Sequence, residues 1–600
     1  MAVNTWDGST DTDWDTAANW TTTGVTDRVP TSADNVVIAN VTNKPVIGDG
    51  LNPTVLSIEV ETSSQLTCGA NTITCTSERS DYAFNVSGTL VPSASTLVLS
   101  SIGSDTYIKV DNGTLNHLTI NSSGDEIKLA NNLTVGGNLT ITAGELDILG
   151  RDLTVTGELK IDGGTLTCND SDVIVRNIYM DGGTLSAPSN SSTNGLEVTG
   201  EGTTGGGGDY SIRIESGTIT HNNGTLALSA DSNTFMRLGN GWHDFIIRND
   251  GSSTTRTHEF INPTTINGDF TLTNGSLQSY NTSWGISVTG NVLITKGQLG
   301  RSSAAYDSSF GSLTIAADGT YIATSGTTEI TDEAGSGYCV DNSGTFTHNS
   351  GTLEIGYSGT SLVKLGSSVN NVTLRAENTH TEWVDNTTIA GDLIIVEGLF
   401  RAYNSTFTID VNGDVSIESG GTLGHTGAAQ AFEFGSLTIA SGGTYIATSG
   451  TTTITSMTST GSGDRSLSLV SGGTFTNNSG TVLFNSGADQ RLQMAGTGNL
   501  YNLTVNKSDN EFITFGNLTI LNNLDVTLAA DHTWRPNAGS DTLTVYGNTY
   551  LTTGKIGNTT QYTGTNNWGN VTINSGEFIL STGTNNVSGI RNVGGTVSQS

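Results

Sequence analysis

Apolar and polar residues alternate in short runs along the whole chain, as in GNLTI, GDVSI and GSLTI. The apolar positions are mostly Val, Ile and Leu, Thr or Ser lies between them, and Gly, Asn or Asp separates the runs. A period of two predicts β-strands with one buried face, and the Gly, Asn and Asp residues predict turns. No stretch has the spacing of three and four residues that an amphipathic helix requires. The pattern therefore predicts an all-β protein.

These strands recur at a short, regular spacing. Five of them are expected at steps of 19, 21, 22 and 22 residues, centred on Leu353, Val372, Leu393, Val415 and Leu437. A step of about 21 residues with Gly and Asn corners is typical of one coil of a parallel β-helix. A string of β-sandwiches would instead show units of about 100 residues with hairpin signals. We therefore predict a single long parallel β-helix, or β-solenoid.

A longer repeat is superimposed on these coils. Four similar segments are 129, 127 and 129 residues apart: GTLVPSASTL from Gly88, GTITHNNGTL from Gly217, GTFTHNSGTL from Gly344 and GTFTNNSGTV from Gly473. Six coils of about 21 residues account for a unit of about 128 residues. The chain is thus expected to repeat a six-coil unit.

The best-preserved part of this repeat occurs twice. Phe310–Thr331 and Phe434–Thr455 differ at three of 22 positions, and every apolar residue except Ala317 is the same. The acidic residues Asp318 and Glu329 are absent from the second copy. Because the packing residues are kept while the charges vary, we interpret the segment as structural and not as a site used twice.

The repeat defines the domain organisation that we expect. Residues 1–50 differ from the rest and are predicted to form an N-terminal cap, in which Trp6, Trp14 and Trp20 cover the first coil. The other parts follow in chain order: first coils at 51–87, repeat units at 88–216, 217–343, 344–472 and 473–594, and the start of a further unit or an open end at 595–600.

The charge excludes some classes of partner. The formal net charge is −33 at pH 7 and the isoelectric point is about 4.3, so the surface repels phosphate backbones and anionic lipids. We expect no nucleic acid and no membrane insertion, since no apolar run reaches the length of a transmembrane helix. The residues after Met1 also lack the basic start and apolar core of a signal peptide.

The four cysteines, Cys68, Cys75, Cys168 and Cys339, do not have the spacing of a metal site. Cys68 and Cys75 flank a turn in TCGANTITC. They are therefore either bridged to each other or buried separately on strands, and the sequence leaves both alternatives open.

One unrepeated acidic cluster stands out in RAENTHTEWVDNT, which contains Glu377, Glu382 and Asp385. Two carboxylates in one groove would suit glycoside hydrolysis. A solvated loop is the interpretation that we favour, and we assign no catalytic residue. The protein is accordingly predicted not to be an enzyme.

A second acidic run, Asp7, Asp11, Asp13 and Asp15, offers carboxylate oxygens that could hold Ca²⁺. The run lacks the spacing of an EF-hand loop and of the GGxGxD repeat. We therefore assign no metal-binding and no cofactor-binding residue. Binding of Ca²⁺ by this acidic run is the one alternative that we keep.

His221 and His348 occupy equivalent positions of two repeats, and Asn477 occupies the same position in the next. Six coils at about 4.8 Å each separate equivalent residues by nearly 30 Å, so the two histidines cannot share a metal. The Asn in the third copy indicates a corner position.

Aromatic residues in the loops are the candidates for ligand contact. Exposed aromatic rings stack on sugar faces, which suggests weak, multivalent glycan or receptor binding by Trp242, Tyr280, Trp284, Trp383 and Tyr403. The alternative, which we favour, is that such corner aromatics cap the apolar column.

The cap pattern W-D-G…D-W…N-W…V-P…D-x-V-x-I, followed by G-x-L-T-I coils, resembles large β-helical surface proteins. These include the haemagglutinin-type adhesins of bacteria and the repetitive fibres and tailspikes of phages. The resemblance covers the whole chain and implies an extracellular or virion-exposed shaft for adhesion or support. It transfers no catalytic residue.

These expectations give a hypothesis for function: a non-enzymatic structural or adhesive rod outside the cell or on the virion surface. The shaft of a phage tail or head fibre is the first interpretation, because no signal peptide is seen. The alternatives are a secreted or cell-surface bacterial adhesin or filament subunit, and a polysaccharide-degrading tailspike. Expected partners are copies of the chain, other fibre or virion subunits, and cell-surface glycans.

Overall fold

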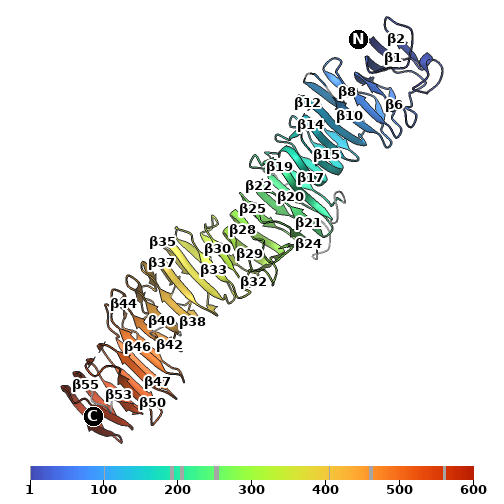
Figure 1. The fold of residues 1–600 in the computed structure, drawn as a ribbon. Coiled ribbons are helices and arrows are strands. Elements are labelled where there is room, and N and C mark those ends of the chain that lie inside the picture. Colours follow the sequence, from blue (N-terminus) through green and yellow to red (C-terminus); the bar gives the residue numbers. More distant parts are fainter. Residues whose placement is uncertain are drawn as a thin grey trace. The chain divides into compact units, whose positions relative to one another are not determined.

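The structure is a computed structural model of the chain. It describes residues 2–100, 102–103, 105–111, 113–189, 195–202, 209–248, 256–404, 406–458, 464–557 and 563–599. The chain divides into two compact units, Met1–Arg301 (unit 1) and Ser302–Ser600 (unit 2) (Figure 1).

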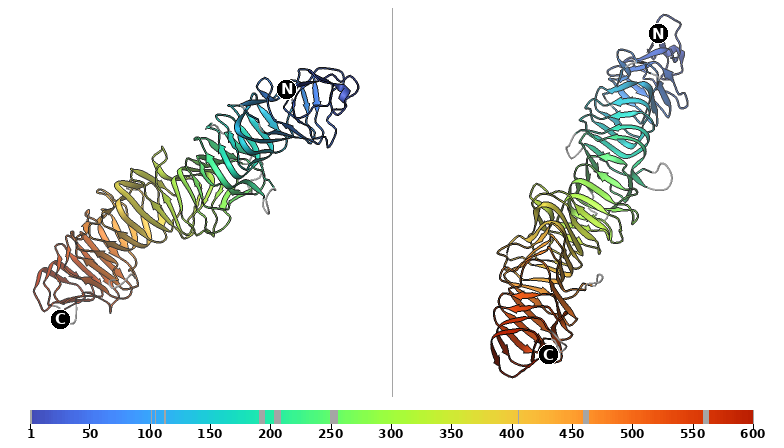
Figure 2. Two further views of the ribbon diagram at one scale, coloured as in Figure 1. Left: turned by 45° about the horizontal axis from the view of Figure 1, so that its top comes forward. Right: turned by 60° about the vertical axis from the view of Figure 1, so that its left-hand side comes forward.

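Both units are parallel β-solenoids. Together they contain about 24 coils with stacked turns about 22 residues apart, and the chain is 56% strand and 1% helix. Within each unit the strands of successive coils lie side by side (Figure 2). The predictions of an all-β protein and of a parallel solenoid with coils of about 21 residues are therefore confirmed. The boundaries of the six-coil units stay a prediction. No helix in the described part of the chain is long and apolar enough to cross a membrane.

The predicted strand centres are stacked on one another in unit 2. Leu353, Val372, Leu393, Val415 and Leu437 form one column of direct register partners, and all five side chains are buried. They lie on β33 (Thr352–Ile355), β35 (Asn371–Trp383), β37 (Leu393–Ala402), β38 (Ile409–Ile417) and β40 (Phe432–Ile439). Each such side chain contributes about 1.5–3 kcal/mol by leaving water, so the column is a main source of stability.

The corners repeat as closely as the strands. The Nδ1 atoms of His221 and His348 accept the backbone N–H two residues further on, at 3.0 and 3.1 Å. Asn477 does the same through Oδ1 at 3.0 Å. Each bond closes a turn whose next two residues have positive φ, for example Asn478 (44°) and Ser479 (60°). The corner role predicted for this position is thus what the structure shows.

The N-terminal end differs from the coils in its strand pairing. β1 (Ala2–Trp6) pairs in parallel with β3 (Asp34–Ile38) and antiparallel with β2 (Trp20–Thr22). The only helix among the described residues, the 3-10 helix η1 (Ala17–Asn19), precedes β2. β2 therefore covers the edge of β1 that faces away from the coils, which blocks strand addition there.

The three tryptophans of this end pack together. The ring of Trp20 meets Trp6 and Trp14 edge to face, at centroid distances of 5.0 and 4.7 Å. The indole of Trp20 donates to the Trp14 carbonyl at 2.7 Å, and that of Trp6 donates to the Asn43 carbonyl at 2.8 Å. All three side chains are buried, so they form a small core of their own over the first coil.

Candidate functional site

The outer surface of unit 1 carries a row of aromatic side chains, which we call the aromatic stripe. Its members are outward-facing residues on or after β17 (Val173–Ser186), β19 (Tyr210–Thr220), β21 (Thr234–Arg237) and β27 (Ser276–Ser279). The first three strands are paired in this order, and β24 (Thr257–Phe260) lies between β21 and β27. The members are Tyr179, Tyr210, Phe235, Tyr280 and Trp284.

The rings of the stripe touch in sequence. Tyr210 and Phe235 are 5.8 Å apart between centroids, and Phe235 meets the edge of Tyr280 at 5.5 Å. Tyr280 in turn stacks on Trp284 at 6.5 Å with an angle of 28° between the rings. These contacts fix the orientation of the rings, so that little side-chain entropy remains to be lost on binding a ligand.

Arg213 joins Tyr179 to the other rings. Its guanidinium lies over both Tyr179 and Tyr210, at 5.5 and 5.1 Å from the ring centroids. The same guanidinium is hydrogen-bonded to Glu215 at 2.7 Å, which holds the pKa of that carboxyl below its usual range. The stripe is therefore braced by a charged network, and only part of each ring face is available to solvent.

Tyr280 is the most accessible ring of the stripe, with 55% of its surface exposed. Arg301 donates to the carbonyls of Ser279 and Tyr280 at 3.0 and 2.9 Å and anchors the backbone there. A large aromatic ring held in water in this way is a feature of ligand-binding surfaces. Of the sequence candidates, the structure thus brings Tyr280 and Trp284 together on one surface.

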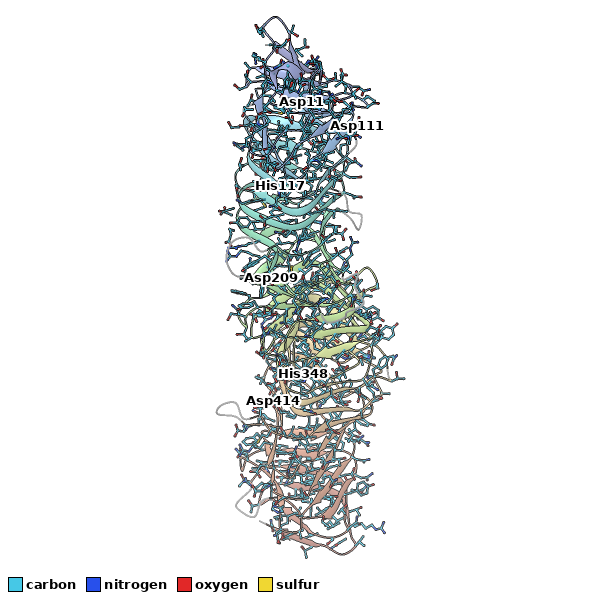
Figure 3. The ribbon with its side chains drawn as sticks, turned by 90° about the vertical axis from the view of Figure 1, so that its right-hand side faces the viewer. Asp11, Asp111, His117, Asp209, His348 and Asp414 are labelled. Atoms are coloured by element: carbon cyan, nitrogen blue, oxygen red, sulfur yellow. The ribbon has the colours of Figure 1, made fainter. Side chains whose placement is uncertain are left out.

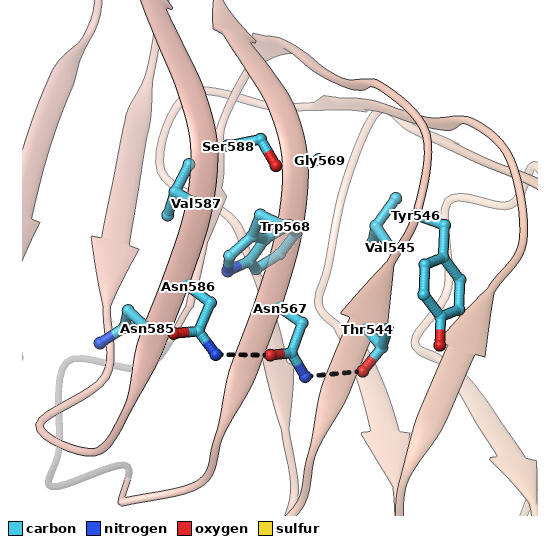
Figure 4. Close-up of a pocket in the computed structure, with 10 residues that line it drawn as sticks. All are labelled: Thr544, Val545, Tyr546, Asn567, Trp568, Gly569, Asn585, Asn586, Val587 and Ser588. Carbon is cyan, nitrogen blue, oxygen red and sulfur yellow. Dashed lines mark hydrogen bonds between the residues drawn. The ribbon is translucent and has the colours of Figure 1, made fainter.

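A second candidate surface lies in unit 2 and is concave. It is a groove of about 560 Å³ on β52 (Leu543–Val545), β55 (Asn566–Ile573) and β57 (Asn585–Asn592). Asn586 donates to Asn567 at 2.8 Å, and Asn567 donates to Thr544 at 3.1 Å, which makes a ladder of polar side chains (Figure 4). Beside the ladder, Tyr546 is 70% exposed. An exposed ring next to amide groups offers both stacking and hydrogen bonds to a hydroxyl-rich ligand.

Two of the sequence candidates are corrected by their burial. Trp242 and Trp383 are only 2% and 1% exposed, so neither ring can stack on a ligand. Trp242 donates its indole N–H to the Leu238 carbonyl at 2.8 Å, and Trp383 packs edge to face on Phe400 at 5.2 Å. Both side chains belong to the interior, which agrees with the alternative interpretation that corner aromatics cap the apolar column.

Tyr403 is exposed to 56% and lies in unit 2, directly after β37. Its backbone N–H donates to the Trp383 carbonyl at 2.8 Å, which fixes its place above the core. Tyr403 is thus accessible to a ligand. Among the described residues, its ring does not contact any other aromatic candidate from the sequence.

In the acidic cluster of RAENTHTEWVDNT, the two carboxylates whose side chains the structure describes have structural roles. Glu382 is 7% exposed and accepts hydrogen bonds from Arg401. Asp385 accepts the backbone N–H of Leu365 at 2.8 Å and the Thr387 hydroxyl at 2.9 Å. The side chain of Glu377 lies outside the described part. These bonds commit the two described carboxylates to holding neighbouring coils together.

The acidic run near the N-terminus is likewise engaged with its own loop. Asp11 accepts from the Asn19 amide and from the Asp13 N–H, and these bonds lower its pKa. Among the described residues, no three His, Cys, Asp or Glu side chains are grouped so as to hold a metal ion. Figure 3 shows Asp11, His117 and Asp209 at separate levels along unit 1.

The four cysteines are free thiols, and all are buried. Cys68 and Cys75 are not bridged, which answers the question that the sequence left open. Burial raises the pKa of both thiols to about 12. They act as small apolar residues of the core and not as reactive groups.

The sequence candidates missed several outward-facing rings. Tyr546 follows the inward-facing Leu543 and Val545, and simple alternation places it outside. Phe235 could have been found in the same way, because Thr234 and Met236 face inward. Alternation fails for Tyr210, because a register shift between Tyr210 and Ile212 turns its ring outward.

No family model matches the chain, and neither the curated proteins nor the solved structures contain one that is significantly similar to it. The interpretation of function therefore rests on the β-solenoid fold and on the surfaces described above. The fold is compatible with a structural rod or an adhesin.

Proposed function

We propose that the protein is a non-enzymatic structural and adhesive element exposed outside the cell or on a virion, and that unit 1 binds glycans through the aromatic stripe. The shaft of a phage tail or head fibre is the setting that we favour, on the strength of the resemblance in the cap and coils. The weak contacts of single rings would add up when several coils engage one polymer.

The observation that carries this proposal is the ring-to-ring contact from Tyr210 through Phe235 to Tyr280 and Trp284 on the outer surface. Most outward positions of the coils hold Thr, Ser or Asn, so a continuous aromatic surface is not required by the fold. Rings already braced by their neighbours bind a sugar face at low entropic cost.

Glycan binding can be tested by affinity electrophoresis of the purified chain in gels that contain bacterial surface polysaccharides. We expect the wild type to be retarded by at least one of them. Replacing Tyr280→Ala and Trp284→Ala together should weaken the apparent affinity about tenfold, because two stacking contacts are lost. Tyr403→Ala removes an equally exposed ring outside the stripe and should change the affinity less than twofold.

Equal loss with Tyr403→Ala would show that exposed rings act singly and would remove the role given to the stripe. Retardation that persists in the double variant would do the same. The non-enzymatic part of the proposal has its own assay, the release of reducing ends from each retarding polysaccharide. Turnover in that assay would favour a polysaccharide-degrading tailspike instead.

A further inference from the structure

Three of the nine Lys and Arg residues of unit 2 gather on one outer surface of this acidic protein. Arg491 lies on β46 (Gln490–Met494) and Arg535 on β51 (Thr533–Pro536), on either side of Ile513 of β48 (Phe512–Phe515). Arg465 precedes β43 (Leu467–Leu469), which pairs with β46. The backbone of the next residue, Ser466, donates to the Arg491 carbonyl at 2.8 Å.

Arg465 is held in a fixed position. Its guanidinium carbon lies 3.6 Å from the centre of the Phe515 ring, which is a close stacking contact. Its Nε donates to the Gln493 side chain at 3.3 Å, and its Nη1 donates to the Asp464 carbonyl at 2.9 Å. Within the described part of the chain these bonds leave its Nη2 without a partner.

Arg491 has no acidic partner among the described residues, and its Nε is buried without a hydrogen bond. Arg535 is different, because it is paired with Glu511 at 2.9 Å. A guanidinium that is partly removed from water and left unpaired is unfavourable unless an anion completes its hydrogen bonds.

The two unmatched guanidiniums also act on each other. Burial and the charge of Arg491 lower the pKa of Arg465, and Asp464 is the one acid among the described residues that opposes this. The two like charges therefore lie close enough to disfavour each other, and a bound anion would relieve this repulsion.

We propose that Arg465 and Arg491 together bind a carboxylate group of an acidic polysaccharide. The planar fork of a guanidinium matches the two oxygens of a carboxylate, and such charge-assisted bonds are about twice as strong as neutral ones. Phe515 orients the first guanidinium, and Gln493 holds its Nε edge. The anion site stands on these contacts alone; only the choice of a polysaccharide as its source rests on the proposed function.

The test is affinity electrophoresis of the full chain in gels with polygalacturonate, dextran sulfate, neutral dextran or polyglutamate. We expect polygalacturonate to retard the wild type most, and added salt to weaken the retardation. Arg491→Gln should reduce the affinity for polygalacturonate at least tenfold. Arg491→Lys keeps the charge but loses the fork, and should recover only part of it.

The matched control is Arg375→Gln, which removes the same charge from an arginine of unit 2 that is paired with Glu354 at 3.0 Å. It should leave the affinity within twofold of the wild type. Melting temperatures of the three variants show whether each is folded, and Phe515→Leu provides a second route to the same site by removing the stacking face.

The proposal is overturned if Arg491→Gln and Arg375→Gln weaken binding equally, or if neutral dextran retards the chain as strongly. Stronger retardation by dextran sulfate or by polyglutamate would assign the site to sulfate groups or to an acidic polypeptide and would also overturn it. Loss of binding in Tyr280→Ala/Trp284→Ala with no effect of Arg491→Gln would leave the aromatic stripe standing and reject the anion site.

Discussion

The phenolic oxygen of Tyr321 lies 2.9 Å from Oγ1 of Thr328, inside the solenoid of unit 2. The same bond recurs 124 residues later between Tyr445 and Thr452, at 2.7 Å. All four residues are buried, and burial raises the pKa of both phenols. Two of the polar residues that do not change between the copies, the tyrosine and this threonine, are thus partners of an internal hydrogen bond and belong to the packed interior with the apolar residues.

The first prediction concerns this bond. Tyr445→Phe leaves the Thr452 hydroxyl buried without a partner, and should lower the free energy of unfolding by about 1–3 kcal/mol. Urea unfolding followed by tyrosine and tryptophan fluorescence measures the loss. The double variant Tyr445→Phe/Thr452→Val removes both polar groups and should be less destabilised than Tyr445→Phe. A double variant that loses the sum of both single effects would contradict the pairing.

The second prediction concerns pH. His258 is fully buried, its Nδ1 lies 2.9 Å from the Thr234 hydroxyl, and burial lowers its pKa from 6.5 to about 4. Between these two values the unfolded chain binds the proton and the folded chain does not, so stability falls as the pH is lowered through this range. The loss should reach about 3 kcal/mol.

Urea unfolding of the wild type and of His258→Gln at several pH values between 4 and 6.5 measures this effect. Carboxylates titrate in both proteins, so the difference between the two pH profiles isolates the imidazole. Parallel profiles would show that His258 titrates normally in the folded chain.

The third prediction concerns a corner glycine. Gly297 has φ of +97°, and a Cβ there would lie 1.9 Å from the Gly275 carbonyl oxygen, which accepts the N–H of Gln298 at 2.9 Å. Gly297→Ala should therefore break this bond between coils as well as strain the backbone. Gly124 has φ of +100° with no atom within 4 Å of such a Cβ, so Gly124→Ala isolates the strain, at about 1–3 kcal/mol.

Thermal unfolding of both glycine variants gives the comparison. Gly297→Ala should lower the melting temperature clearly more than Gly124→Ala. Equal shifts would mean that the close approach of the Gly275 carbonyl does not limit the side chain at this corner.

The fourth prediction concerns the thiols. Because thiolates are the reactive form and all four thiols are buried, the native chain should not react with a thiol reagent at pH 8. In denaturant four groups should be labelled. Cys339 reports on unit 2 and the other three cysteines on unit 1, so mass spectrometry of labelled peptides shows which unit opens first. Rapid labelling of Cys68 without denaturant would contradict its burial.

The fold could be predicted from the sequence because a coil depends on local patterns. The alternation of Val, Ile and Leu with Thr and Ser, and its step of about 21 residues, placed Leu353, Val372, Leu393, Val415 and Leu437 on five strands, and these residues are direct register partners. The corner turns could be predicted for the same reason, because each is closed by a local bond: His348 and Asn477 each accept the backbone N–H two residues further on.

The candidate site was less predictable. Whether an aromatic ring faces in or out depends on register and on bulges, which composition does not reveal. Trp383 was expected in a loop but ends a long strand whose partners bury it. Tyr210 faces out only because of a bulge. Arg491 is left unpaired because of which residues surround it on neighbouring coils, such as Arg465, which lies 26 residues earlier in the chain. No sequence motif predicts this arrangement.

The equal register of the two copies also has a genetic consequence. Phe310 is aligned with Ile330, and Phe434 with Ile454, so both copies form a coil of the same register and present Ile330 and Ile454 to the next coil in equivalent positions. A misaligned crossover between their coding sequences shortens or lengthens the protein by 124 residues, and every new junction still joins matching edges. The gene can therefore change the length of its product in whole steps without redesigning a single core contact.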